Sequence, residues 1–485
     1  MNGKSALETR LQAALASREE RWIRRRLPDP ALSTSSTHPS PLADFTSNDY
    51  LSLSASSKLR THLLQRLSTA PDILGSGGSR LLVNGRAHAQ LEERLAAFFG
   101  GEEALLFNSG FDANVGFFAC VPQRGDVVIY DEYIHASVHD GLRSSRVAPD
   151  SQFSFPHNSL SGLWDLLSRL KAERRGLRDG ESSLFLAVES LYSMDGTFAP
   201  LTEMADMLEE VFPLKNAYLV VDEAHSTGIY GPQGRGRVAL LGLEDRVLAR
   251  LHTFGKALAA TGAVVITSTL IRDYLLNYAR SLIYTTSLSY ANIIAADCSF
   301  DMLVDGTAQH LSNRLLDLSS YFTNTLQPLL TSRQIPPTLV SLPSSLSSPH
   351  HPPTPSPPHP HLPSPIIPLP SPIIPIHTPH PRPLSAYLLA LGLNARPITW
   401  PTVPKGKDRV RVCLHAGNTR AEVDRLVRGV VDWAEETLRL GVGVDLGVDL
   451  KLGGGERGGG GGGGGDGVRR TGRGRVLDGV LESKL

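Results

Sequence analysis

Cysteine is scarce in this chain, and long apolar runs are missing from it. The 3 cysteines, Cys120, Cys298 and Cys413, have no paired spacing that would suit disulfides or a zinc site. We therefore expect a reducing environment and no metal centre. No apolar run reaches the roughly 18 residues that a membrane-spanning helix needs, so we expect no membrane span.

Net charge is also missing. The sequence holds 48 basic and 48 acidic residues, which gives nothing that would attract nucleic acid or an anionic membrane surface. The N-terminal stretch has no apolar core and carries Glu8, Glu19 and Glu20. These features argue against a secretory or organellar leader.

What remains is an ordinary composition for a soluble protein, with 41% hydrophobic and 20% charged residues in 485. The length allows two or three domains. Alternating short apolar runs and helical patterns indicate an α/β fold.

The most informative stretch runs from Tyr218 to Ala263. Tyr218–Val221 is a short apolar run typical of a strand buried on both faces, and Asp222 and His225 follow it. Ligands of open α/β sheets bind beyond the carboxyl ends of the strands, which makes both residues site candidates. Lys256 lies among small residues after a second apolar segment, where lost hydration would make its amine nucleophilic. Taken singly, such an Asp is often a helix cap and such a Lys a solvated charge.

The combination D-E-A-H at 222–225 with T-F-G-K at 253–256 resembles the α-oxoamine synthases, a family of fold-type I pyridoxal phosphate (PLP) enzymes. The resemblance implies a large domain with a mostly parallel central sheet and a smaller α+β C-terminal domain. It implies that Lys256 carries the cofactor, that Asp222 pairs with its ring nitrogen, and that His225 lies beside its ring hydroxyl. A carboxylate there keeps the ring protonated and able to withdraw electrons.

Further motifs match this family's cofactor site. NSGFDAN at 108–114 resembles the phosphate turn, which assigns Gly110 and Phe111 to the cofactor, and a turn that opens a helix suits an anion. H-A-S resembles the segment of the stacking histidine, here His135. ESLYSMDG at 189–196 is similar to a motif that brings Glu189 near the substrate and Ser193 near the cofactor; both are assigned to cofactor binding.

Other matches imply a dimer with shared sites. Thr253 joins the cofactor set, and Thr285 and Thr286 match a segment whose hydroxyls approach the partner subunit's phosphate; the family's usual prolines after it are absent. The glycine-dense stretch 75–85 is by itself a flexible loop, but it resembles the family loop that approaches the neighbouring active site. We therefore expect a homodimer.

The substrate residues come from both ends of the chain. FTSNDYLSLS at 45–54 resembles the family's entry segment, with Asn48 assigned to the substrate and Ser52 in place of the usual glycine. Arg24, the first of an arginine triplet, is matched to the acyl substrate. Near the C-terminus, a P-T-V-P segment assigns Thr402 to the substrate and Arg411 to its carboxylate, which a guanidinium binds through two parallel hydrogen bonds. Arg396 is a candidate for a distal acid of the acyl chain.

We expect four regions. Residues 1–45 form an N-terminal helix, with its helical pattern at 5–26, and a connector; residues 46–290 form the large PLP-binding domain. Residues 291–440 form the small domain, which begins with a helical pattern at 291–330. A disordered Pro/Ser/His insertion interrupts this domain at 341–370, and a strand follows in SPIIPIHT. A disordered glycine-rich tail covers 441–485 and ends in Ser483–Lys484–Leu485, a tripeptide read by the peroxisomal import receptor. Peroxisomal, otherwise cytosolic, localisation follows.

Family chemistry condenses an amino acid with an acyl-CoA and releases CoA and carbon dioxide. The missing mitochondrial leader disfavours 5-aminolevulinate synthase activity, and the missing membrane anchor disfavours serine palmitoyltransferase activity. A peroxisome produces acyl-CoA chains by β-oxidation, which favours an enzyme that uses pimeloyl-CoA. We expect L-alanine and pimeloyl-CoA as substrates, giving 8-amino-7-oxononanoate for biotin synthesis. Glycine acetyltransfer, a 5-aminolevulinate-synthase-like activity and a catalytically silent partner subunit are the alternatives.

Overall fold

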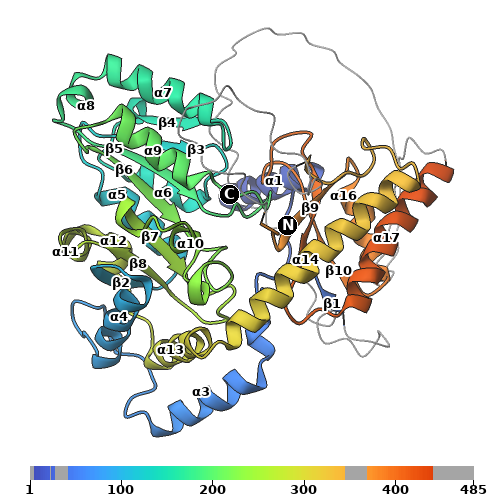
Figure 1. The fold of residues 1–485 in the computed structure, drawn as a ribbon, viewed down its shortest axis with the longest axis horizontal. Coiled ribbons are helices and arrows are strands. Elements are labelled where there is room, and N and C mark those ends of the chain that lie inside the picture. The colour runs from blue at the N-terminus through green and yellow to red at the C-terminus, as the bar shows by residue number, and fades with distance from the viewer. Residues whose placement is uncertain (1–4, 22, 28–41, 345–368, 441–485) are drawn as a thin grey trace.

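A seven-stranded sheet organises the large domain (Figure 1). The structure is a computed structural model that describes residues 5–21, 23–27, 42–344 and 369–440. The sheet order is β2-β8-β7-β6-β5-β3-β4, and only β8 runs antiparallel to its neighbours. Its strands are β2 (Glu103–Phe107), β3 (Val127–Asp131), β4 (Gln152–Phe155), β5 (Leu184–Glu189), β6 (Ala217–Asp222), β7 (Val247–Thr253) and β8 (Ala263–Thr267).

Helices cover both faces of this sheet, which explains why its central strands are apolar throughout. On β6, Leu219 and Val221 pack with α7 and α9, whereas Val220 faces the cluster that contains α5 and α6. The large-domain helices are α4 (Arg86–Phe99), α5 (Gly110–Cys120), α6 (Ala136–Arg143), α7 (Leu160–Glu173), α8 (Arg175–Asp179), α9 (Leu201–Val211), α10 (Arg237–Leu241), α11 (Thr269–Tyr278) and α12 (Arg280–Ile283). Burial of each large apolar side chain between the sheet and these helices contributes about 1.5–3 kcal/mol to the free energy of unfolding.

The small domain is built on a three-stranded antiparallel sheet in the order β11-β12-β9. Its strands are β9 (Ile373–His377), β11 (Arg396–Ile398) and β12 (Arg409–Cys413). The helices α14 (Thr307–Ser332), α16 (Pro381–Ala390) and α17 (Arg420–Arg439) cover it, and α14 runs from the large domain alongside α17 (Figure 1).

An N-terminal segment is part of this small domain in space. β1 (Ala43–Asp44) pairs in parallel with β10 (Leu393–Asn394), about 350 residues later in the chain. Ser52, which replaces the family glycine, has φ 54°, a left-handed conformation that explains why glycine suits this position. The segment thereby brings residues 45–52 to the junction of the two domains.

The predicted fold class is confirmed: the chain has a mostly parallel central sheet flanked by helices and a smaller mixed domain. The predicted strand in SPIIPIHT is also confirmed as β9. Most of the predicted insertion, residues 345–368, and the whole tail at 441–485 lie outside the described residues. None of the described helices is long and apolar enough to cross a membrane.

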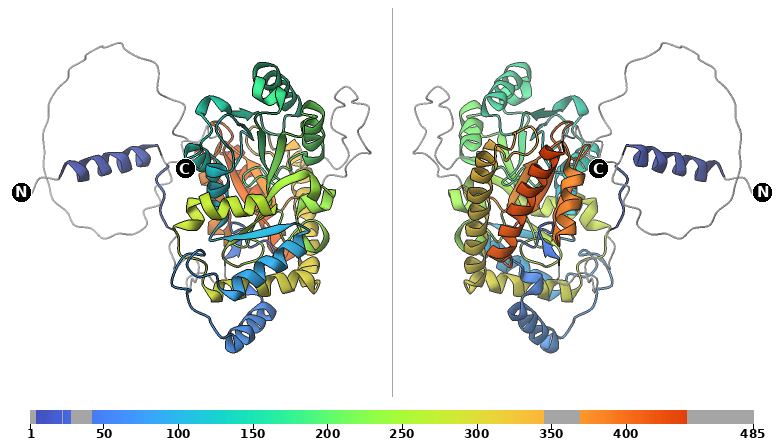
Figure 2. Two further views of the ribbon diagram at one scale, coloured as in Figure 1. Left: turned by 90° about the vertical axis from the view of Figure 1, so that its left-hand side faces the viewer. Right: turned by 90° about the vertical axis from the view of Figure 1, so that its right-hand side faces the viewer.

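Two predicted helices have different bounds. The N-terminal helix α1 (Ala6–Glu20) ends before the arginine triplet instead of continuing to residue 26, and none of its residues is buried. A helix without tertiary packing has little to extend it through consecutive like charges. The predicted helix over 291–330 is two helices, α13 (Tyr290–Val304) and α14, because Gly306 at φ 83° breaks the chain direction. Figure 2 shows α1 standing away from the body, and α3 (Ser57–Thr69) at its lower edge.

Candidate active site

Three of the predicted residues meet at the carboxyl edge of the central sheet. Asp222 is the last residue of β6, His225 lies in the turn that follows, and Lys256 lies just beyond β7. The Lys256 Nζ atom is 2.9 Å from His225 Nε2. Neighbouring parallel strands end at one edge, so this proximity follows directly from the pairing of β6 with β7.

A buried carboxylate holds the turn that carries His225. Glu223 is fully buried and accepts hydrogen bonds from Ser190 Oγ at 2.8 Å and from the backbone N–H groups of Arg237 at 3.0 Å and Val238 at 2.6 Å. Gly236, at φ 98°, passes so close that an added Cβ would lie 2.7 Å from the Glu223 carboxylate. The D-E-A-H segment and the glycine loop after it are therefore one packed unit.

Burial controls the charge of the two basic groups. It lowers the pKa of Lys256, although the nearby carboxylates of Asp222 and Glu189 oppose this. It lowers the pKa of His225 well below its ordinary value, and the positive charges of Lys256 and Arg411 add to the effect. The amine is therefore easier to deprotonate than that of a solvated lysine, and the imidazole is neutral at physiological pH.

Asp222 is oriented by neighbours on both sides. Its Oδ2 atom accepts a 2.8 Å hydrogen bond from Asn114 Nδ2, and its Oδ1 atom accepts one from the Ala224 N–H at 2.9 Å. His135 is the N-cap of α6, and its Nδ1 atom is 2.7 Å from Ser137 Oγ. The Phe111 ring packs edge-on against the His135 ring, with centroids 6.5 Å apart.

Glu189 ends β5 directly opposite Asp222 in the strand register. Burial raises the pKa of Glu189 well above its ordinary value, and the Asp222 charge raises it further. Its Oε1 atom is buried without a hydrogen-bond partner among the described residues. An unpaired buried polar atom at this edge is a natural contact for a ligand.

Arg411 connects the small domain to this edge. It lies on β12, its side chain is almost fully buried, and its Nε atom donates a 2.6 Å hydrogen bond to the carbonyl oxygen of Ser193. Its Nη2 atom donates to Asn48 Oδ1 at 3.1 Å and to the Tyr50 hydroxyl at 3.5 Å. The structure thus brings three predicted residues from three distant segments together.

Tyr50 lies between His225 and Arg411 and was missed in the sequence analysis. Its hydroxyl lies 2.7 Å from His225 Nδ1 and also donates to Asn48 Oδ1 at 3.2 Å. Asn114 was missed as well. Both residues lie inside recognised motifs, the entry segment and the phosphate turn, so motif position was the available signal. What was lacking was any sign of where their side chains point.

The phosphate turn begins α5, whose N-cap is Ser109. Gly110 faces β7: an added Cβ would lie 3.4 Å from the Thr253 Cβ. Thr285 and Thr286 lie on the same side, because Asn108 Nδ2 donates to Thr285 Oγ1 at 3.1 Å and to the Thr286 carbonyl at 2.7 Å. Within one chain, the two threonines therefore adjoin their own phosphate turn.

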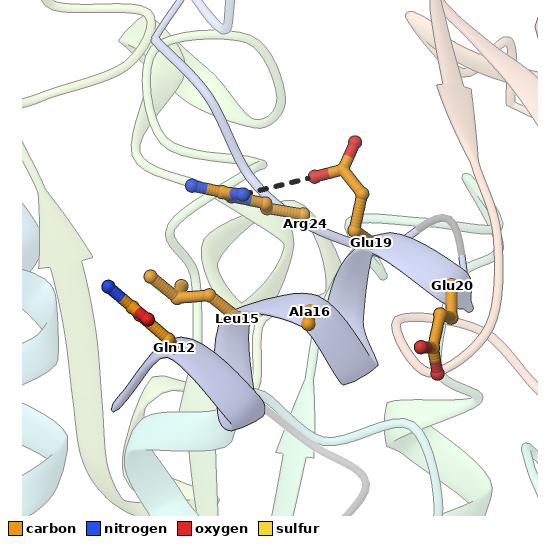
Figure 3. A pocket seen from close by; sticks show the side chains of 6 residues that line it. All are labelled: Gln12, Leu15, Ala16, Glu19, Glu20 and Arg24. Atoms are coloured by element: carbon orange, nitrogen blue, oxygen red, sulfur yellow. Dashed lines mark hydrogen bonds and ion pairs between the residues drawn. The ribbon is translucent and has the colours of Figure 1, made fainter. Parts of the chain in front are cut away.

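Three predicted substrate residues lie at the periphery. Arg24 is ion-paired with Glu19 at 3.4 Å, beside a groove of about 560 Å³ along α1 (Figure 3). Arg396 is exposed and stands directly opposite Arg411 in the pairing of β11 with β12. Thr402 is exposed in the turn after β11. Of these, only Arg396 is next to a residue of the assembled site.

One cluster has side chains that could ligate a metal, but its charges are already paired. His62, Cys298 and Asp301 come together between α3 and α13. The Asp301 carboxylate lies 2.8 Å from Arg94 Nη2 and 2.7 Å from His62 Nε2. A carboxylate that already faces a guanidinium is a poor cation ligand.

The assembled residues suit PLP in chemical terms. The cofactor has an aldehyde for a neutral amine, a ring nitrogen for an oriented carboxylate, and a phosphate for a helix N-terminus. Lys256, Asp222 and the Ser109–Gly110 turn supply these three groups along one sheet edge. The buried Arg411 reaches this edge from the small domain, where it contacts Ser193 and Asn48.

Comparison with known proteins supports this interpretation. The aminotransferase class I and II family matches residues 40–430. The chain is 42% identical over 433 residues to the 8-amino-7-oxononanoate synthase of Emericella nidulans, covering 88% of this chain and 96% of that protein. It is 37% identical over 412 residues to the aminoacyl transferase sphA of Aspergillus fumigatus, covering 83% of each.

Solved structures share the fold. The serine palmitoyltransferase of Sphingomonas wittichii superposes with a TM-score of 0.71 at 23% identity, covering 90% of this chain and all of that one. The 8-amino-7-oxononanoate synthase of Francisella tularensis gives a TM-score of 0.59 at 24% identity, over 83% of this chain and 99% of the other.

Proposed function

This chain belongs to the aminotransferase class I and II family of PLP-dependent enzymes, and from that premise we propose that it condenses an amino acid with an acyl-CoA, with loss of carbon dioxide and CoA. The observation that carries the proposal is the Lys256 Nζ atom 2.9 Å from His225, beside an Asp222 carboxylate already oriented by hydrogen bonds. PLP, when bound, withdraws electrons from the carbon next to the amino group.

Each residue of the site has a distinct role in this proposal. Lys256 would hold the cofactor in the resting enzyme, and its free Nζ atom would accept the proton from the amino acid's α-carbon. Arg411 holds the amino acid's carboxylate, and Asn48 keeps the guanidinium in place. Asp222 and His135 would contact the cofactor ring, and His225, Ser193 and Thr253 would position it. Because small changes in these positions alter the reacting geometry, each is expected to matter for rate.

The proposed substrates are L-alanine and pimeloyl-CoA, which would give 8-amino-7-oxononanoate, a precursor of biotin. The 42% identity over nearly the whole of an 8-amino-7-oxononanoate synthase supports this choice. The relative sphA, at 37% identity, carries a different name, so related chains differ in substrate. Glycine C-acetyltransferase and 5-aminolevulinate-synthase-like activity are the alternatives. A catalytically silent partner subunit is disfavoured, because Lys256, Asp222 and His225 are all present and adjacent.

A substrate matrix tests this proposal. Purified protein with PLP is assayed for CoA release with alanine, glycine or serine against acetyl-, succinyl- and pimeloyl-CoA. We expect the highest kcat/KM for alanine with pimeloyl-CoA. A higher value for another pair would transfer the assignment to that activity, and no release with any pair would favour the silent-subunit alternative.

We also propose that the protein acts as a homodimer and that Ser483–Lys484–Leu485 directs it to peroxisomes. The tripeptide lies outside the described residues, and every matched motif precedes residue 441. Deleting these three residues should therefore leave activity in vitro unchanged but move an N-terminally tagged fluorescent fusion from puncta to cytosol. A truncated fusion that stays punctate would contradict the address.

A further inference from the structure

Two polar side chains connect Asp222 to His135. Asn114, on α5, is 4% exposed, and its Nδ2 atom donates hydrogen bonds to Asp222 Oδ2 at 2.8 Å and to Ser137 Oγ at 3.0 Å. Ser137 is fully buried at the start of α6, and its Oγ atom lies 2.7 Å from His135 Nδ1. The result is an unbroken chain of four residues from the end of β6 to the cap of α6.

The direction of each hydrogen bond in this chain follows from its acidic end. An ionised carboxylate only accepts, so the amide nitrogen of Asn114 must face Asp222. Its second N–H then points to Ser137 Oγ, which acts as acceptor and has its own proton free to donate to His135 Nδ1. The backbone N–H of Ser137 also points to this nitrogen, at 3.3 Å.

Two donors directed at His135 Nδ1 require a lone pair on that nitrogen. The neutral ring must then carry its proton on Nε2. Burial lowers the pKa of His135, and the nearby Lys256 charge lowers it further while Asp222 opposes the change. The Nε2–H is the one N–H of the ring left to face a ligand.

We propose that Asn114 is a positioning residue that orients the Asp222 carboxylate and, through Ser137, holds His135 as its Nε2–H tautomer. The proposal rests on the proposed function only where it places the PLP ring against these two side chains. Asn114 thus couples the group that contacts the ring nitrogen to the group that covers the ring face, without contacting the reacting atoms itself.

The network has two arms: the hydrogen bond from Asn114 to Asp222, and the hydrogen bonds that connect Asn114 through Ser137 to His135. Two variants separate these arms. Asn114→Ala removes both hydrogen bonds and leaves Asp222 with the Ala224 N–H. Ser137→Ala breaks only the His135 arm. The matched control is Asn216→Ala: Asn216 is also buried, also donates two hydrogen bonds from Nδ2, each at 2.8 Å, and precedes the opposite end of β6.

The first measurement is histidine-selective ¹⁵N NMR of the full-length, cofactor-free protein, with the His135 signals assigned by their loss in His135→Gln. We expect Nε2 to be the protonated nitrogen in the wild type and in Asn216→Ala. Asn114→Ala frees the Ser137 hydroxyl to accept a hydrogen bond from His135 instead of donating one, and Ser137→Ala leaves only the longer backbone N–H contact. Both variants should therefore shift His135 toward a mixture of tautomers. A wild-type His135 protonated at Nδ1, or an unchanged tautomer in both network variants, would overturn the proposal.

The second measurement is the PLP dissociation constant. It should rise about tenfold in Asn114→Ala, because a hydrogen bond to a charged group is lost, and stay at the wild-type value in Ser137→Ala and Asn216→Ala. An Asn114→Ala protein that binds PLP like the wild type would contradict the Asp222 arm. If Asn114→Ala does not fold, the wild-type tautomer and Ser137→Ala decide the question. A protein with the expected tautomer but no affinity for PLP would contradict the proposed function and leave the network standing.

Discussion

The site has two halves that are built differently. The cofactor half consists of Asp222, His225 and Lys256, which follow neighbouring strands of one sheet and lie within 35 residues of each other in the sequence. The substrate half consists of Arg411 from the small-domain sheet and Asn48 and Tyr50 from the entry segment. Arg411 and Tyr50 are 361 residues apart in sequence but 3.5 Å apart in space.

The difference shows which forces place each half. A parallel sheet aligns the ends of its strands by backbone hydrogen bonds, so the cofactor half needs no special side-chain contact to assemble. The substrate half depends on the docking of one domain against another. Tyr50 connects the two halves, because its hydroxyl lies 2.7 Å from His225 Nδ1 in the cofactor half and 3.5 Å from Arg411 Nη2 in the substrate half.

The largest effect is expected from a substitution that disrupts the cofactor half. Lys256→Ala should abolish the visible absorption of bound cofactor and lower kcat by roughly a thousandfold or more, because it removes both the attachment point and the proton acceptor. Lys171→Ala, on α7, serves as the control and should behave as the wild type. Full activity in the Lys256 variant would refute the assignment.

The second prediction concerns a substitution that disrupts the substrate half. Arg411→Ala should raise the KM for the amino acid by about a hundredfold, as expected when a buried charge partner is truncated. The matched control is Arg396→Ala, which removes an exposed arginine directly opposite on β11. It should change this KM by less than about threefold, and any effect should appear in the KM for pimeloyl-CoA. Equal effects of both variants on the amino-acid KM would refute the carboxylate role of Arg411.

A third prediction asks whether one chain completes its own phosphate site. Lys256→Ala and Thr285→Ala/Thr286→Ala are each expected to be inactive. If the threonines serve the partner's phosphate, mixed dimers contain one intact site, and refolding the two variants together should recover about a quarter of wild-type activity. If they serve their own chain, as the contacts with Asn108 would allow, heterodimers form without recovered activity. The outcome assigns the threonines either to the phosphate site of their own chain or to that of the partner subunit.

The smallest expected effect concerns the charge of Glu189. Its pKa is raised above the ordinary value of 4.5, so the unfolded chain ionises this group first as pH rises. Folding then takes up a proton, and the free energy of unfolding of the wild type falls with pH by up to about 1.4 kcal/mol per pH unit. Glu189→Gln removes this dependence and should gain stability relative to the wild type from about pH 5 upward.

Urea unfolding of the cofactor-free proteins at several pH values measures this difference. Glu173→Gln, which changes an exposed carboxylate at the end of α7, is the control and should show no relative gain. A constant difference between Glu189→Gln and the wild type at all pH values would mean that Glu189 is ionised in the folded protein. Its orphaned oxygen would then have to be satisfied by charge pairing with Lys256.

The sequence alone determined the fold class and the cofactor, and it placed Asp222 directly after a buried strand. These features depend on local patterns: an apolar run specifies a buried strand, and a motif at its end specifies what lies at the sheet edge. β6 extends the strand predicted at Tyr218–Val221 by one residue at each end. Helix ends were harder, since α1 stops at Glu20 for lack of packing and Gly306 divides the helix expected over 291–330.

Only the tertiary structure decided which side chains meet. The positions of Tyr50 and Asn114 were readable within their motifs, but the contacts of Tyr50 with His225 and of Asn114 with Asp222 join segments more than 100 residues apart. Arg24 and Arg411 were assigned from motifs of the same kind, yet one lies beside an exposed helix and the other is buried at the domain junction. A local pattern fixes the backbone and the type of side chain, whereas its partners depend on how distant segments pack, which is a property of the folded chain as a whole.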